Sequence, residues 1–107
     1  MKNYKEILEG KSDYEVYHKS YTDAVSELIK YVEKNKYMIS SDDIWNEITT
    51  GPSKPKDGQT NRFNFLLWTM KEEPAKKSIS VQITGLSKSY ELNMYFGMAR
   101  IKDYRGM

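Results

Sequence analysis

Hydrophobic residues recur at helical spacing in the first half of the chain. Six of them lie three or four positions apart and would form one stripe on a helix: Tyr21, Ala24, Val25, Leu28, Ile29 and Val32. Ser20 precedes the stripe and is suited to cap the helix, because its hydroxyl can accept a hydrogen bond from a free backbone amide. The spacing therefore predicts a helix over residues 21–36.

A second, shorter helix is expected over residues 42–49. Ser41 would cap its N-terminus, and Gly51-Pro52 would end it. The pattern before residue 20 is less specific. Residues 4–9 could form one or two helical turns, whereas residues 14–17 alternate in polarity and could form a short strand, and the pattern leaves both open.

The second half changes to the two-residue period of β-strands. Apolar and polar residues alternate in three segments, 62–68, 78–84 and 90–96. The side chains expected in the core are Phe63, Phe65, Ile79, Val81, Ile83, Leu92 and Met94. Because the connections between the segments are short, the strands are expected to form an antiparallel meander.

These elements predict an α+β fold, in which two helices pack on one face of a three-stranded antiparallel meander sheet. The helix residues expected to lie over the strands are Val25, Leu28, Ile29 and Val32. A chain of 107 residues suits one hydrophobic core, so a single domain, 1–107, is expected. Its parts would be a helical part at 1–50, a loop at 51–61, a β-meander at 62–96 and a tail at 97–107.

The composition excludes several classes of protein. The chain has no Cys, which removes disulfides, thiolate nucleophiles and Cys-based zinc sites, and His18 is its one histidine. Mean hydropathy is -0.78, yet 13% of the residues are aromatic, which is atypical of a disordered chain. The sequence shows neither an apolar run long enough for a membrane span nor a secretory signal, so we expect no membrane partner and no secretion.

The acidic residues give little reason to expect catalysis. Asp42 and Asp43 fall in the first turn of the predicted second helix, where the helix dipole favours them. On that helix Asp43 and Glu47 would share a face, whereas Asp42 would not join them. We therefore expect no enzyme activity, no cofactor and no metal. A magnesium-dependent nuclease is the alternative, since carboxylates beside a lysine can support two-metal chemistry.

Charge is unevenly distributed along the chain. Residues 1–50 hold seven Lys and ten Asp or Glu, whereas residues 51–107 hold ten Lys or Arg and five Asp or Glu. The two halves therefore carry charges of -3 and +5, for the net charge of +2. This asymmetry indicates either an anionic partner for the basic half or ordinary charge balancing between packed elements.

Candidate binding residues gather around the predicted loop and the strands that follow it. They are Lys54, Lys56, Thr60, Asn61, Arg62, Lys76, Lys77 and Tyr95. Lys and Arg bind phosphates, Thr and Asn add directional hydrogen bonds, and an outward Tyr offers a stacking surface. In an antiparallel hairpin Arg62 would pair near the end of the second strand, so the loop cluster and the lysine pair are expected at opposite ends of the sheet.

Three segments of this half carry a distinctive pattern: GPSKPKDGQTNRFNF at 51–65, AKKSISVQI at 75–83 and YELNMYF at 90–96. Together they resemble a family of small uncharacterised proteins of tailed phages. The matching positions are Gly51, Pro52, Lys54, Pro55, Gly58, Thr60, Asn61, Arg62, Lys76, Lys77 and residues 90–95. Gln59 stands where that pattern has a basic residue. The resemblance implies phage origin and a small non-enzymatic role, and it brings no catalytic residues.

We therefore expect a non-enzymatic interaction protein that uses the basic loop and the sheet beside it as its contact surface. A protein partner is favoured: the protein would act as a host-directed inhibitor or as a component of the virion. Its expected location is accordingly the host cytoplasm or the virion. The alternative is a binding module for nucleic acid or for a nucleotide ligand.

Overall fold

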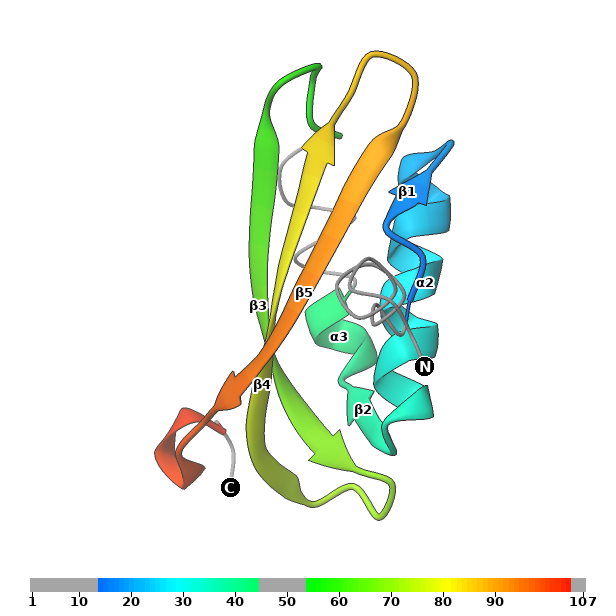
Figure 1. The fold of residues 1–107 in the computed structure, drawn as a ribbon. Helices are drawn as coiled ribbons and strands as arrows, with labels where there is room; N and C mark the ends of the chain where they lie inside the picture. Colours follow the sequence, from blue (N-terminus) through cyan, green and yellow to red (C-terminus); the bar gives the residue numbers. More distant parts are fainter. Residues whose placement is uncertain (1–13, 45–53, 105–107) are drawn as a thin grey trace, which may run out of the picture.

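The computed structural model describes residues 14–44 and 54–104, which form a small mixed α/β domain. Five strands make one curled antiparallel sheet in the order β1-β5-β4-β3-β2, with a helix along one side (Figure 1). The strands are β1 Tyr17–His18, β2 Tyr37–Ile39, β3 Thr60–Thr69, β4 Pro74–Gly85 and β5 Tyr90–Met98. The helix, α2, spans Tyr21–Lys34.

The predicted fold class is wrong in the number of both helices and strands. Where we expected two helices on a three-stranded sheet, the described residues form a five-stranded sheet with one long helix, α2. The element α3 spans only Ser41–Ile44, and residues 45–49 of the second predicted helix lie outside the described residues. The two additional strands, β1 and β2, are two and three residues long, too short to show a two-residue period in the sequence.

Helix α2 begins where the sequence predicts and ends two residues earlier. The Ser20 hydroxyl accepts a hydrogen bond from the Asp23 amide at 3.0 Å, which caps the N-terminus. Asn35 is the C-cap, and Lys36 then adopts a left-handed backbone with a φ of 69°. Capping residues at the N-terminus and at the C-terminus therefore define the ends of the helix.

The core lies between α2 and one face of the sheet. The helix contributes Ala24, Leu28 and Val32, which are at most 1% exposed. All seven strand residues predicted for the core are buried: Phe63, Phe65, Ile79, Val81, Ile83, Leu92 and Met94. Val25 packs against the core partly buried, but Ile29 is 39% exposed, so its prediction as a core residue is wrong. The buried stripe of the helix is narrower than its apolar stripe.

The C-terminal segment crosses the sheet at an irregularity in β4. The register of β3 and β4 shifts between Leu66 and Trp68, and Lys76 has a left-handed φ of 59° there, as in a β-bulge. After β5 the Ala99 amide donates to the Lys76 carbonyl at 3.1 Å. The short 3₁₀ helix η2, Ile101–Asp103, follows and lies beside the lower part of β4 in Figure 1, and Tyr104 after it contacts β3 and β4.

Tyr104 fills this bulge. Its side chain is 2% exposed, and its hydroxyl donates to the Leu67 carbonyl at 2.7 Å while accepting from the Lys77 amide at 3.2 Å. The ring packs edge-on against Trp68, with the ring centroids 5.0 Å apart. A bulge interrupts the ladder between two strands, and here the tyrosine hydroxyl takes the place of the missing strand partner.

Candidate binding surface

One face of the sheet points away from α2. Because side chains alternate along a strand, the neighbours of the buried residues project from the opposite face. Two rows of residues cross β3, β4 and β5 on that face, and we call these six residues the open face: Arg62, Gln82 and Asn93, then Asn64, Ser80 and Tyr95. Four of the six side chains are exposed, while Gln82 and Asn93 are partly buried.

The open face offers hydrogen-bonding groups and one aromatic ring. The Ser80 hydroxyl donates to the Asn64 side-chain oxygen at 3.1 Å, and the side-chain amide nitrogen of Asn93 donates to the Glu91 carboxylate at 3.2 Å. Tyr95 is 57% exposed. This surface is therefore suited to contact a polar partner by hydrogen bonds, with the tyrosine ring as its largest apolar contact.

The loop before β3 is fixed against the end of β4. The Gly58 amide donates to the Gly85 carbonyl at 2.7 Å, and the Gly85 amide donates to the Gln59 carbonyl at 2.8 Å. A Cβ at Gly85 would lie 2.3 Å from the Lys56 carbonyl oxygen, so the absence of a side chain there lets the loop pack this closely. Lys54 and Lys56 are exposed on this loop, at the end of the sheet that carries Arg62.

Two predicted site residues contact neighbouring side chains: Asn61 on the helix side of the sheet, and Thr60 on the same side as the open face. Asn61 pairs with Ile83 and lies on the helix side of the sheet, beside Tyr21. Burial raises the pKa of the Tyr21 phenol above its ordinary value, and the nearby Asn61 side chain acts in the opposite direction. The Thr60 hydroxyl is hydrogen-bonded to the Thr84 hydroxyl at 2.7 Å. The structure therefore does not bring Asn61 to the open face, and it engages Thr60 within the sheet.

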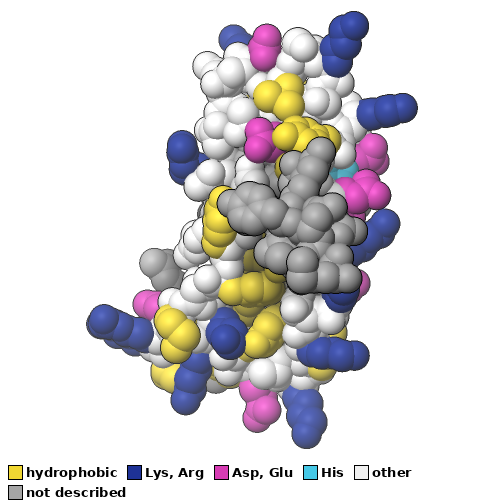
Figure 2. Space-filling view, in the orientation of Figure 1, with side chains coloured by type: hydrophobic (Ala, Val, Ile, Leu, Met, Phe, Trp, Pro, Cys, Tyr) yellow, Lys and Arg dark blue, Asp and Glu magenta, His cyan; other side chains and the backbone are white. Residues whose placement is uncertain are grey.

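Lys76 and Lys77 lie at the other end of the sheet, as the hairpin geometry predicts. Lys77 pairs with Met98 at the end of β5, whereas Gln82 lies in the row of Arg62. The rise along β4 between Gln82 and Lys77 amounts to roughly 17 Å. Figure 2 shows Lys and Arg side chains at both ends of the molecule, not in one patch. A ligand that contacts both basic clusters must therefore span the open face.

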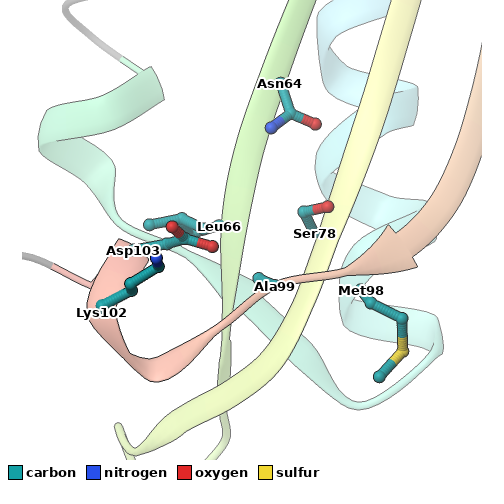
Figure 3. Close-up of a pocket in the computed structure, with 7 residues that line it drawn as sticks. All are labelled: Asn64, Leu66, Ser78, Met98, Ala99, Lys102 and Asp103. Carbon is teal, nitrogen blue, oxygen red and sulfur yellow. The ribbon is translucent and has the colours of Figure 1, made fainter.

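A pocket of about 460 Å³ lies where the open face meets η2 (Figure 3). Its lining residues are Asn64, Leu66, Ser78, Met98, Ala99, Lys102 and Asp103. The Asp103 carboxylate accepts a hydrogen bond from the Arg100 amide at 2.8 Å, so it also stabilises η2. Because Asn64 belongs to both the pocket and the open face, a partner side chain could enter the pocket while its backbone lies on the sheet.

The acidic residues considered for catalysis lie beside this region. Asp42 and Asp43 line a neighbouring pocket of about 520 Å³, together with Trp68 and Tyr104. Across residues 14–44 and 54–104, no three His, Cys, Asp or Glu side chains gather in a way that could hold a metal ion. Glu47, the third acid of the nuclease alternative, lies outside the described residues.

Sequence reasoning missed one exposed aromatic residue at the border of the open face. Tyr17 of β1 pairs with Glu91 of β5 and is 64% exposed. Partners directly opposite in a sheet share a face, so Tyr17 lies on the same side as Tyr95. The alternation at 14–17 left a strand open, but the position of that strand at the edge of β5 depends on a distant partner that no local pattern reveals.

Comparisons with known proteins add no relative to this picture. No family model, curated protein or solved structure matches the chain. The resemblance to phage proteins therefore stays a prediction, and the function is argued from the surface itself. None of the described helices is both long and apolar enough to span a membrane.

Proposed function

We propose that this protein is a non-enzymatic interaction protein that binds a protein partner through the open face. One observation carries the proposal: α2 covers one face of the sheet, while Arg62 and Tyr95 are exposed on the other. Tyr and Arg are enriched at protein interfaces and among the residues that dominate binding energy. The polar residues around them match the composition of an interface that forms between separately folded proteins.

The distribution of charge favours a protein over a nucleic acid. Arg62 is the one cation among the six residues of the open face. Glu91 pairs with Thr84 in the next row of the sheet, beside the row of Arg62. A nucleic acid is held mainly by several cations that follow its phosphates. The loop lysines and the pair Lys76 and Lys77 are instead separated by the length of the open face. Nucleic-acid binding is the second candidate, because Tyr95 could stack on a base beside Arg62.

The resemblance to phage proteins suggests where such a partner is found. A host-directed inhibitor would bind a host enzyme in the host cytoplasm, whereas a virion component would bind another protein of the particle. Both roles use the same contact surface, so they are separated by the identity of the partner and not by the residues that bind it.

Affinity capture tests this proposal. The baits are the unmodified protein, the double variant Arg62→Ala/Tyr95→Ala and a control, Thr22→Ala, which alters an exposed position on α2. Each bait is incubated with host-cell lysate and with disrupted virions, and captured proteins are quantified. We expect a specific partner on the unmodified and control baits, and its loss from the double variant.

Two outcomes would contradict the proposal. Capture that is unchanged in the double variant would remove the open face from the interface. Binding of labelled single-stranded or double-stranded nucleic acid at low and high salt is measured in parallel. If affinity falls steeply with salt and no protein is captured, the second candidate replaces the first.

A further inference from the structure

The loop at the Gly85 end of the open face is held rigidly. Besides the two hydrogen bonds that join it to Gly85, the Gln59 amide donates to the Lys56 carbonyl at 2.8 Å. Pro55 is buried, while Lys54 and Lys56 on either side of it are exposed. A loop that is already fixed in place loses little conformational entropy when a ligand binds. The two lysines are therefore presented in a preorganised way.

Two further cations lie at the same end of the sheet, and together the four form what we call the basic rim: Lys54, Lys56, Arg62 and Lys88. Arg62 is near the start of β3, and Lys88 is in the turn after Gly85. All four are exposed, and within the described part of the chain none of their charged groups has an ion-pair partner. The exposed Asp57 on the same loop offsets one of the four charges, so the rim keeps an excess of positive charge. Neighbouring cations repel one another, and an anionic ligand would lower the electrostatic energy of this excess.

Acidic residues limit the extent of that ligand. Glu91 lies on the β5 side of the same end, and Asp103 lines the pocket at the far end of the open face. A polyanion laid along the sheet would meet both carboxylates. A polypeptide that is acidic at one end and neutral beyond it would instead match the rim first and then the neutral side chains of Asn64 and Ser80.

From these charges we infer that the basic rim binds an acidic segment of the protein partner, whose side-chain carboxylates are the groups recognised. The inference rests on the proposed function, since it assigns the chemistry of the partner at one end of the same surface. The segment that follows the acidic residues then lies along the open face toward Tyr95.

The test uses a fluorescently labelled Glu-rich peptide and a matched peptide in which Gln replaces every Glu. Anisotropy titrations with the full chain should show binding of the Glu peptide and at least about tenfold weaker binding of the Gln peptide at low salt. The variant Lys54→Gln/Lys56→Gln should bind the Glu peptide about fivefold more weakly. The control Lys76→Gln/Lys77→Gln removes the same charge at the opposite end and should bind it as the unmodified protein does.

Three results would overturn the inference: no binding of the Glu peptide, an equal loss in the two double variants, or tighter binding of a labelled single-stranded oligonucleotide. Circular dichroism of each variant checks that it is folded. Failure of this inference is distinct from failure of the proposed function. If the Glu peptide does not bind but Arg62→Ala/Tyr95→Ala still loses its captured partner, only the assignment of an acidic segment is wrong.

Discussion

The two faces of the sheet are built from the same strands and differ in what they contact. Phe65 is 1% exposed within the core, whereas its neighbour Asn64 is exposed on the open face. Both residues belong to β3 and pair with consecutive rungs of β4, so backbone conformation does not distinguish them. The difference lies in side-chain chemistry: the apolar face packs against α2, and the polar face is left available for a partner.

Substitutions at this pair of neighbours should give the largest contrast. Phe65→Ala should lower the free energy of unfolding by about 3–5 kcal/mol, through lost burial and a residual cavity. Asn64→Ala should lower it by about 1 kcal/mol or less, because the side chain is exposed. Urea denaturation followed by fluorescence measures both. Equal costs would show that the two faces are wrongly assigned.

A smaller effect is expected where the loop packs on the end of the sheet. Gly85→Ala should cost about 1–3 kcal/mol, because the new methyl group overlaps the backbone of Lys56. Gly97→Ala is the control: its Cβ would lie 3.4 Å from the Ser78 hydroxyl oxygen, which is close to an ordinary contact. Thermal unfolding and limited proteolysis of the loop compare the variants. If Gly85→Ala is as stable as the control and its loop as resistant, the loop is not held by this contact.

The hydroxyl that fills the β-bulge provides a comparison between two tyrosines. Tyr104→Phe should cost about 1–2 kcal/mol, because the groups of Leu67 and Lys77 that it contacts lose a buried partner. Tyr95→Phe, on the open face, should leave stability nearly unchanged, since that ring is 57% exposed. The denaturant midpoints of the two variants, each compared with that of the unmodified protein, measure the two losses of stability. A neutral Tyr104→Phe would mean that water or another group replaces the hydroxyl.

The sequence predicts the interior better than the edges of the fold. Ile79, Val81 and Ile83 alternate with polar residues, and local alternation suffices to place them in the core. β1 and β2 arise instead from pairing with distant strands, which no local pattern records. Tyr104 could not be predicted either, because its burial depends on a bulge in a strand far from it in the sequence.

The candidate site shows the same division. Lys54, Lys56 and Arg62 are exposed, as their charge alone predicts. Asn61 is a candidate site residue because it follows the loop. However, it lies two residues before the buried Phe63, and residues two apart in a strand share a face, so Asn61 lies on the side covered by α2. Composition alone selects polar residues, whereas the period of the strand decides which of them face a partner.

Hydroxyl-radical footprinting of the protein, free and bound to its captured partner, tests most directly whether the open face is the interface. Tyr95 and Tyr17, which are 57% and 64% exposed, should be modified in the free protein and protected in the complex. Ile29 of α2, which is 39% exposed and lines a pocket with Ile39 and Ile44, should be modified equally in both states. Protection of Ile29 with unchanged modification of Tyr95 would contradict the account and place the partner on the helix.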